Sequence, residues 1–399
     1  MSFVKINSLI SSLTAMTPPF VYLDNNATTV CAPEVVAAMI PYMSASSYGN
    51  PSSGHFAGRQ AYRAVELARE QLAAILSVGK HELFFNSGAT EGNNWIFYSL
   101  LKSRPKKRRI VVSSIEHKSV LLTARSLVEY GYEVIELPVT TDGVVDLATA
   151  KALITEDTLL VAVQYANNET GVIQPIQQLT ELAHRQGALM HCDAVQGLGK
   201  ATLNISELEV DSASFSAHKI HGPKGVGALY LNHGVCHWPF ALPLQGGGQE
   251  KQVRPGTLNV PGIVGFGVAA DLIYQNLPER LKYMRHLCDI LEESLYDNFL
   301  GCIIHGSSVP RIANTTNVAI PGISSDILMA NLPLICISNG SACNSGAIGG
   351  SYVLEAMDIC PKEIEESIRV SVSIYNKTEE MELFINRVLE FVEGNTEIL

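Results

Sequence analysis

A single lysine, Lys219, has the surroundings that an amine nucleophile requires. It lies within residues 216–223, directly after an apolar strand-like segment, and hydroxyl and imidazole side chains flank it. Burial lowers the pKa of a lysine because the charged form loses hydration, and a neutral amine can attack an aldehyde to form a Schiff base. An ordinary lysine in a turn after a strand would have the same neighbours, so the residues upstream must decide between the two interpretations.

Polar residues upstream of Lys219 follow strand-like segments one after another. Residues 86–92 form a turn of small residues that opens a helical pattern, where free amides and the Thr90 hydroxyl can bind a phosphate or simply cap the helix. His117 follows the next strand-like segment, where its flat ring can stack on an aromatic cofactor or be structural. Residues 167–171 form a further polar run, which can also be an ordinary turn.

Asp193 completes the set of candidate residues. It belongs to the run His191, Cys192, Asp193, and adjacent residues of a strand point to opposite faces, so these three cannot share one zinc ion. Asp193 and Lys219 follow successive strand-like segments, so the carboxylate can face a ring nitrogen while the lysine holds the aldehyde of the ring. A phosphate-binding turn, a stacking imidazole, this aspartate and this lysine together describe a site for pyridoxal phosphate.

Apolar segments that alternate with helical patterns indicate the elements that position these residues. They are 83–85, 110–112, 133–137, 159–163, 188–191, 212–215 and 227–231. Such alternation predicts an α/β fold with a mostly parallel sheet covered by helices on both faces. The carboxyl ends of parallel strands meet helix N-termini at one edge of the sheet, so we expect the polar runs to converge there.

The pattern changes beyond Pro261. A helical stripe of apolar residues runs through 281–295, and shorter strand candidates follow at 317–320, 336–338 and 369–372. We therefore expect an N-terminal arm that joins the small domain, a large cofactor-binding domain, and a smaller α/β C-terminal domain. Their predicted bounds are 1–28, 29–270 and 271–399.

Composition argues against several classes of protein. A formal charge of -11 disfavours bulk attraction to nucleic acid or anionic membranes, and we interpret the basic cluster 102–109 as a solvated loop. No apolar stretch reaches the roughly 18 residues of a membrane span. The 8 cysteines have no CxxC pair or metal-ligand spacing, which suits a reducing compartment such as the cytoplasm. The Ser-rich opening to Phe20 has no arginine or clear cleavage site, which favours an arm over a targeting peptide.

Motifs spread along the chain resemble the class I cysteine desulfurases of the NifS/IscS group, from about residue 22 to the C-terminal end. The matching motifs are 22–29, 49–53, 87–91, 116–118, 167–169, 191–194, 216–223, 254–257 and 340–343. The resemblance implies the aspartate-aminotransferase-like fold, which is fold type I of the pyridoxal-phosphate enzymes, and a homodimer. It also implies conversion of L-cysteine to L-alanine, with the sulfur left as a persulfide on an enzyme cysteine.

The resemblance implies a role for each matching residue. Lys219 would carry pyridoxal 5'-phosphate, Asp193 would pair with the pyridinium nitrogen, and His117 would stack on the ring and act as acid and base. Gln196 would lie at the ring hydroxyl, and the phosphate would be held by Ala89, Thr90, Ser216 and His218. Thr257 would reach the phosphate of the neighbouring subunit. Asn168 would contact the cofactor and, with Arg369, would bind the substrate carboxylate.

Cys343 is the expected sulfur acceptor. Its segment, 337–350, is rich in Gly, Ser and Asn, which predicts a loosely constrained backbone and a mobile, exposed thiol. An incidental loop cysteine is the alternative. The length of the loop resembles that of the long-loop class of the family, which hands sulfur directly to scaffold or acceptor proteins. Iron-sulfur clusters, tRNA thiolation and DNA sulfur modification all stay open as destinations.

Two departures from the family pattern concern the substrate pocket and the loop. Ser373-Ile374 occupies the place where the family usually has Gly-Arg, so the local charge near the substrate pocket can differ. Residues 344–346 and 349–350 also differ from commoner loop sequences. These differences bear on the partner and on the rigidity of the loop more than on the reaction.

Three rival functions are compatible with the same fold. They are a selenocysteine lyase, an aminotransferase, and a non-catalytic scaffold protein of a sulfur pathway. A transaminase has no need of Cys343, which argues against that rival. The joint presence of Lys219, Asp193 and Cys343 argues against a scaffold without catalysis.

Overall fold

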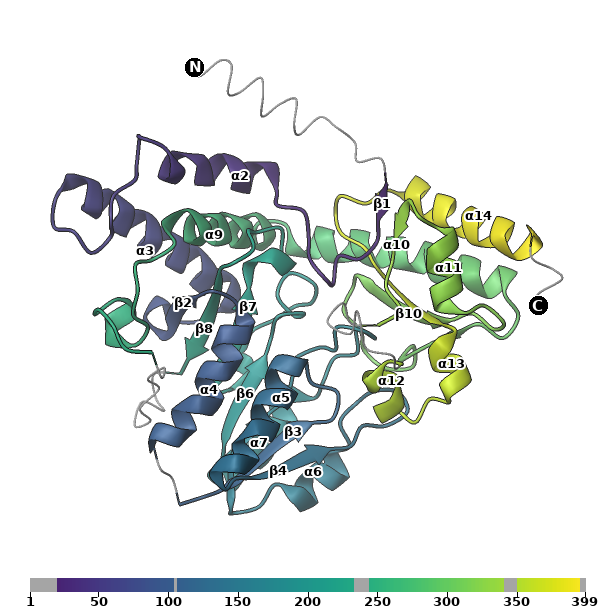
Figure 1. The fold of residues 1–399 in the computed structure, drawn as a ribbon, viewed down its shortest axis with the longest axis horizontal. Coiled ribbons are helices and arrows are strands. Elements are labelled where there is room, and N and C mark those ends of the chain that lie inside the picture. The colour runs from purple at the N-terminus through teal and green to yellow at the C-terminus, as the bar shows by residue number, and fades with distance from the viewer. Residues whose placement is uncertain (1–19, 104–105, 233–243, 341–349, 395–399) are drawn as a thin grey trace.

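The computed structural model describes residues 20–103, 106–232, 244–340 and 350–394. They form a mixed α/β structure in which a large sheet with its helices occupies one end of the molecule and a small sheet with its helices the other (Figure 1). In strand order, the seven-stranded sheet is β2-β8-β7-β6-β5-β3-β4, the three-stranded sheet is β12-β10-β9, and the two-stranded sheet is β1-β11.

The large sheet is mostly parallel, as the alternation of segments predicted. Its strands are β2 (Leu83–Asn86), β3 (Arg109–Ser113), β4 (Glu133–Leu137), β5 (Thr158–Ala162), β6 (Leu189–Asp193), β7 (Ser212–Ser216) and β8 (Gly227–Leu231). Strand β8 runs antiparallel to both neighbours, and the pairs from β7 to β4 are parallel. Several strands extend to a polar residue that the apolar pattern left out, because backbone pairing along the ladder does not require an apolar side chain.

Helices cover both faces of this sheet, which confirms the predicted fold class. One face carries α2 (Pro33–Met39), α3 (Phe56–Leu76), α6 (Leu147–Leu153), α7 (Ile176–Arg185) and α9 (Val260–Tyr274), and the other carries α4 (Ala89–Ser103) and α5 (Lys118–Ser126). In β3, Val111 packs in the hydrophobic core between the sheet and α2, α3, α6, α7 and α9, whereas Ile110 and Val112 pack in the core between the sheet and α4 and α5. Successive side chains of a strand point to opposite faces, so a continuous apolar run feeds both cores.

Close packing of α9 on α3 depends on a glycine. A Cβ atom at Gly267 would lie 2.5 Å from the Cα atom of Ala68, so only glycine lets the two backbones approach this closely. Helix α3 begins with a cap in which Nδ1 of His55 accepts from the backbone N–H of Gly58, and it ends at Ser77 in a left-handed conformation.

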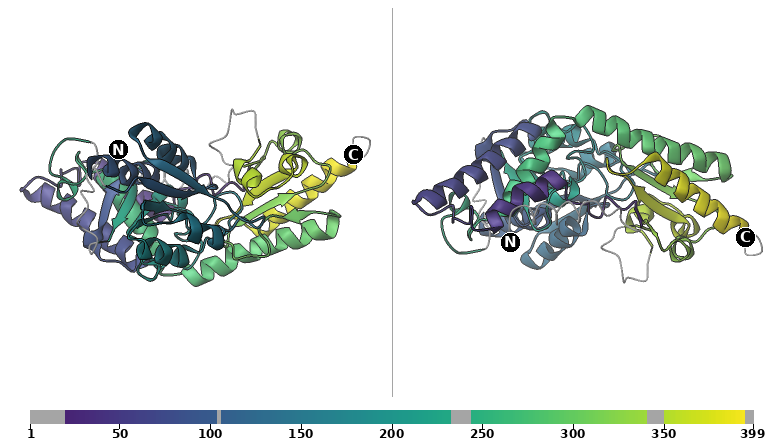
Figure 2. Two further views of the ribbon diagram at one scale, coloured as in Figure 1. Left: turned by 90° about the horizontal axis from the view of Figure 1, so that it is seen from below. Right: turned by 90° about the horizontal axis from the view of Figure 1, so that it is seen from above.

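The C-terminal part of the chain builds the smaller sheet and its core. Its elements are β9 (Ile303–Ile304), β10 (Thr315–Ala319), β12 (Ser367–Ser371), α10 (Leu277–Asn298), α11 (Ser325–Asn331), α12 (Tyr352–Ala356), α13 (Pro361–Glu365) and α14 (Thr378–Gly394). Figure 2 shows α10 and α14 side by side along this end of the molecule. The predicted apolar stripe lies on α10, where Met284, Leu287, Leu291 and Leu295 are buried.

Residues from the start of the chain pair with this C-terminal part. Strand β1 (Val21–Tyr22) runs parallel to β11 (Ile335–Cys336). Helix α9 packs in the core of the large sheet, whereas α10, directly after it, packs in the core of the small sheet. Helix α8 (Ile205–Leu208) is a single turn at the margin of the large sheet.

The basic cluster 102–109 is only partly a loop. Residues 102–103 end α4, and Arg109 begins β3, where its Nε atom lies 2.8 Å from Oε2 of Glu133. None of the helices within the described ranges combines the length and the apolarity that a bilayer crossing demands.

A buried ion pair ties α3 to the segment after the large sheet. The Arg69 guanidinium lies 2.7 Å from Oε1 and 2.9 Å from Oε2 of Glu250, and both side chains are almost fully buried. Arg69 also donates to the carbonyl of Leu83, and Glu250 accepts from the backbone N–H of Phe85. This pair therefore fixes α3, the first strand of the large sheet and residue 250 to one another.

We predict that Arg69→Met destabilises the protein by about 3 to 5 kcal/mol, because it leaves the Glu250 carboxylate buried without its counter-charge. Urea unfolding followed by circular dichroism measures the change. Glu70→Gln is the matched control, since the pair between Glu70 and Lys80 is half exposed and such pairs contribute about 1 kcal/mol or less. Equal unfolding midpoints for the two variants would contradict this account of Arg69.

Candidate active site

One cavity of about 250 Å³ collects the residues that the sequence singled out. Of the twelve predicted site residues, ten line it: Ala89, Thr90, His117, Asn168, Asp193, Gln196, Ser216, His218, Lys219 and Arg369. Six further residues of the lining had no role predicted from the sequence: Asn26, Ala27, Ser119, Gln164, Ala166 and Val195.

The strands of the large sheet deliver these residues to one edge. Ala89 follows β2, His117 follows β3, Asn168 follows β5, Asp193 ends β6 and Ser216 ends β7. Convergence at this edge was expected, because the carboxyl ends of parallel strands meet there. These five residues are far apart in sequence, and the order of the strands in the large sheet makes them neighbours.

One end of the cavity has the properties of a phosphate site. Helix α4 begins at Ala89, whose backbone N–H donates to Oγ of Ser216 over 2.8 Å, and Thr90 adds a second hydroxyl. A helix N-terminus supplies unpaired N–H groups and a partial positive charge, which suit a phosphate. His218 lies beside these groups; burial, reinforced by the nearby charge of Lys219, lowers its pKa to about 4.

Lys219 lies on the short 3₁₀ turn η4 (Ala217–Lys219), directly after β7. Its Nζ atom donates to the backbone carbonyls of Asn26, at 2.5 Å, and Ala27, at 2.9 Å. Both carbonyls are uncharged and belong to the segment that leads away from β1. Lys219 therefore lies in the lining of the cavity, with its amine held by neutral main-chain oxygens.

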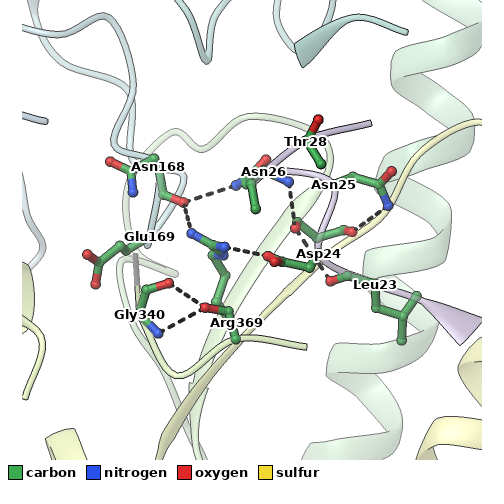
Figure 3. Close-up of polar contacts among 12 residues, drawn as sticks. Leu23, Asp24, Asn25, Asn26, Thr28, Asn168, Glu169, Gly340 and Arg369 are labelled. Carbon is green, nitrogen blue, oxygen red and sulfur yellow. Dashed lines mark hydrogen bonds and ion pairs between the residues drawn. The ribbon is translucent and has the colours of Figure 1, made fainter. Parts of the chain in front are cut away.

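Another part of the cavity, here called the arginine end, is built around Arg369, whose polar contacts Figure 3 shows. Arg369 is 1% exposed, forms an ion pair with Oδ1 of Asp24, and donates from Nη1 to the carbonyl of Asn168 over 3.0 Å. Within the described part of the chain, Nε of Arg369 and Oδ1 of Asn168 are buried without hydrogen-bond partners. Polar atoms without partners are costly to bury. A ligand carboxylate would accept from Nε of Arg369, and a ligand amine would donate to Oδ1 of Asn168.

A second buried lysine lies behind the cavity, and the sequence analysis did not identify it. Lys200 is 4% exposed and donates from Nζ to side-chain oxygens of Gln196 and Asn26. Burial, with the charges of Lys219 and Arg369, lowers its pKa well below the ordinary value for lysine. The only sequence signal was its position four residues after Gln196, within the helical turn that follows β6.

Two predicted site residues do not appear in the cavity. Thr257 is exposed and lies outside it, on the segment between η6 (Glu250–Gln252) and α9. The prediction assigns Thr257 to the neighbouring subunit, so one chain does not test it. Cys343 lies outside the described residues.

The residues that flank the segment of Cys343 contact the arginine end of the cavity. Ser338 pairs through its backbone with Arg369. On the other side, Oγ of Ser351 donates over 2.5 Å to Oε2 of Glu169, which is the neighbour of Asn168. Both flanks are therefore fixed beside the two residues predicted to hold the substrate carboxylate.

The departure at Ser373-Ile374 lies away from this cavity. Both residues border a smaller space on the far side of Lys219, and Ile374 packs against the C-terminal core. The backbone N–H of Ser373 donates to Oδ1 of Asn376 over 2.8 Å. Neither side chain lines the main cavity.

Comparisons with known proteins agree with this geometry. The aminotransferase class-V family model matches residues 21–384. A cysteine desulfurase of Nostoc sp. (strain PCC 7120) is 41% identical over 375 residues, which cover 94% of this chain and 93% of that protein. The cysteine desulfurase IscS of Methanosarcina thermophila is 40% identical, with 93% and 91% covered. A solved NifS-like protein superposes with a TM-score of 0.86 at 39% identity, covering 94% of this chain and all of that one.

The chain belongs to the class-V aminotransferases, a family of pyridoxal-phosphate-dependent enzymes of fold type I. Within that family it is a member of the NifS/IscS group of cysteine desulfurases.

A buried carboxyl group beside the site gives the protein a specific pH dependence. Glu116 is fully buried, and its Oε1 atom accepts from Oγ of Ser113 and from the backbone N–H of Gln164. Burial raises its pKa to about 8, and the nearby Asp193 carboxylate adds to the rise. Its other oxygen is buried without a hydrogen-bond partner in the described chain. The protonated acid is therefore the form that the fold accommodates.

We predict that Glu116→Gln changes how stability depends on pH. Between about pH 4.5 and 8 the native state binds the proton that the unfolded chain releases, so this glutamate lowers the free energy of unfolding as pH rises through that window. Glutamine cannot ionise, so the variant gains stability relative to wild type by up to about 1.4 kcal/mol per pH unit. Unfolding curves at pH 5, 6.5 and 8 measure this, with Glu70→Gln as control. Parallel curves for wild type and Glu116→Gln would refute the raised pKa.

Proposed function

We propose that this enzyme uses pyridoxal 5'-phosphate to convert L-cysteine to L-alanine and takes the sulfur as a persulfide on Cys343. The observation that carries the proposal is the single cavity lined by ten of the predicted residues. One end of that cavity suits a phosphate, and the other suits a carboxylate. A cofactor with a phosphate and a substrate with a carboxylate match this arrangement.

The donor set of the cavity fits the cofactor. Ala89, Thr90, Ser216 and His218 would hold the phosphate, Asp193 the ring nitrogen, Gln196 the ring hydroxyl and Lys219 the aldehyde, while His117 would stack on the ring. When bound, pyridoxal phosphate supplies an electron sink for the charge that develops at the substrate Cα atom. The buried Asp193 carboxylate, 7% exposed, would keep the ring nitrogen protonated.

The substrate carboxylate would bind to Arg369 and Asn168. The unpaired Nε atom of Arg369 supports this role, and the ion pair with Asp24 holds the guanidinium in place. The Nζ atom of Lys219, which donates to two neutral carbonyls, would move the proton at the substrate Cα atom. Burial at 1% exposure strengthens recognition of a carboxylate, because water does not compete for the guanidinium.

The sulfur step would belong to Cys343, as its thiolate. A bond forms between Sγ of Cys343 and the substrate sulfur, and the substrate carbon–sulfur bond breaks. The carbon keeps that electron pair and takes a proton to become the methyl group of alanine. The sum is enzyme thiol plus cysteine giving enzyme persulfide plus alanine, so no outside oxidant is needed. An acceptor or scaffold protein would then receive the sulfur.

We also propose a homodimer in which Thr257 completes the phosphate site of the partner subunit. The exposed position of Thr257, outside the cavity of its own chain, supports this role. Large apolar side chains exposed on the stretch that includes α2 and α3 support an interface with a second copy: Val30, Met43, Tyr48, Phe56, Tyr62 and Leu67.

The domain bounds and the cellular location are part of the same proposal. The change of core between α9 and α10 supports a large domain that ends near residue 270 and a small domain that follows it. The pairing of β1 with β11 supports an N-terminal arm that joins the small domain. Every cysteine in the described ranges is a free thiol, which supports a reducing compartment and hence the cytoplasm.

We predict that Lys219→Ala loses the yellow colour of lysine-bound cofactor and releases pyridoxal phosphate on gel filtration. Lys224→Ala is the control, because Lys224 is exposed five residues further on and should stay yellow. Borohydride reduction followed by peptide mass spectrometry locates the labelled lysine. A label on Lys224 would overturn the assignment of Lys219.

We predict that Cys343→Ser keeps the fold and the bound cofactor but forms no persulfide, so that steady release of alanine falls to background. A serine hydroxyl is almost never ionised at neutral pH and attacks sulfur poorly. The assay mixes enzyme with cysteine and measures alanine and protein-bound sulfur by mass. Cys360→Ser, which alters an exposed thiol elsewhere in the chain, should retain the wild-type rate. Alanine at the wild-type rate from Cys343→Ser, or persulfide on Cys336 or Cys360, would contradict the proposal.

A further inference from the structure

A chain of hydrogen bonds behind the cavity connects His117 to Asp193 through a residue with no assigned role. Asn93 lies on α4, is fully buried, and donates from Nδ2 to Oδ2 of Asp193 and to Oγ of Ser119, each over 2.8 Å. Its Oδ1 atom lies 3.0 Å from Nε2 of His191, which is also fully buried. Oγ of Ser119 lies in turn 2.8 Å from Nδ1 of His117.

The chemistry of these groups fixes the orientation of the Asn93 amide. A carboxylate only accepts hydrogen bonds, so the atom that faces Asp193 must be the amide nitrogen. The amide oxygen then faces His191, which must donate from Nε2. Burial lowers the pKa of His191 to about 3, so its ring is neutral and Nδ1 is left to accept from Oγ of Ser212 at 2.9 Å. Each donor in this part of the network has one compatible acceptor.

The same logic continues to His117. Because Oγ of Ser119 accepts from Asn93, its own hydrogen is available for Nδ1 of His117. The backbone N–H of Ser119 also donates to that nitrogen, over 3.1 Å. Two donors therefore face Nδ1, so a neutral His117 ring must carry its proton on Nε2.

We propose that Asn93 is a positioning residue that acts on two partners of the cofactor at once. It holds the Asp193 carboxylate by a buried hydrogen bond, and through Ser119 it fixes His117 in the Nε2–H tautomer. One amide would thus position both Asp193, which is expected to keep the ring nitrogen protonated, and His117, which is expected to stack on the ring and transfer protons. This inference rests on the proposed function, because it concerns how the site prepares for the cofactor.

Three variants separate the two arms of this hydrogen-bond network, one from Asn93 to Asp193 and the other from Asn93 through Ser119 to His117. Asn93→Asp keeps the shape, removes both N–H donors and sets a second carboxylate against Asp193, so both arms should change. Ser119→Ala cuts only the arm to His117. Asn94→Asp is the matched control, because it makes the same substitution one residue along α4, where Asn94 contacts Thr90 and Thr123 and does not line the cavity.

The first measurement is the tautomer of His117 in cofactor-free protein labelled with ¹⁵N-histidine, assigned by comparison with His117→Gln. Long-range ¹H–¹⁵N spectra should give the Nε2–H form in wild type and in Asn94→Asp. The share of the Nδ1–H form should rise in Asn93→Asp and in Ser119→Ala, while the backbone N–H of residue 119, which still faces Nδ1, keeps part of the population in the Nε2–H form. An Nδ1–H form in wild type, or an unchanged spectrum in both network variants, would overturn the proposal.

The second measurement is the Kd for pyridoxal 5'-phosphate, titrated by absorbance. Loss of a buried hydrogen bond to a charged group predicts a Kd about 10- to 100-fold higher for Asn93→Asp, with little change for Ser119→Ala and Asn94→Asp. A wild-type Kd in Asn93→Asp would refute the arm to Asp193. Should Asn93→Asp not fold, Ser119→Ala still decides the arm to His117. Failure of the wild type to bind the cofactor would instead refute the proposed function.

Discussion

The buried residue Asn26 is the constraint on which much of the site depends, because residues of the large sheet, of the small sheet and of the lysine turn are hydrogen-bonded to its backbone or its side chain. Its carbonyl accepts from Lys219 and Gln196, and its side-chain oxygen accepts from Lys200. Its backbone N–H and side-chain nitrogen reach hydroxyls of the small sheet and the carbonyl of Asn168. A residue near the start of the described chain thus joins the large sheet to the small one. A buried residue with this many hydrogen-bond partners permits few alternative arrangements of the chain around it.

The charge of the cavity follows from this arrangement. Lys219 and Arg369 line it, and the only carboxylate in an ion pair with Arg369 among the described residues is that of Asp24. The chain as a whole carries a formal charge of -11, so the basic character of the cavity is local. Buried positive charges are stabilised by anionic partners. A ligand with a phosphate near the N-terminus of α4 and a carboxylate near Arg369 would supply those partners at both ends.

Much of this arrangement could be predicted from sequence, for identifiable physical reasons. The central strands are continuous apolar runs, and the residues after them must meet at one edge, which accounts for Asp193, Ser216 and Lys219. Strand β1 could not be predicted, because its pairing depends on a partner, β11, about 300 residues away. The roles of Lys200 and Asn93 could not be predicted from sequence for a related reason. Their importance lies in contacts with Asn26, Asp193 and Ser119 across the fold, and nothing in their own neighbourhood distinguishes them from a surface lysine or a helical asparagine.

Strand β12, which bears Arg369, also fixes where the segment that contains Cys343 begins. Ser338 is paired with Arg369 in the backbone, and Cys343 is only three residues beyond Gly340, which lies beside Glu169. Gly340 and Ser351, the described residues on either side of that segment, both lie beside Glu169, so both ends of the segment begin at the arginine end of the cavity. In the proposed reaction, a substrate carboxylate held at Arg369 would therefore place the substrate beside both ends of the segment that contains Cys343. A substrate whose carboxylate lay elsewhere would lose both its anchor and its place beside that segment, so binding and sulfur transfer would share one geometric requirement.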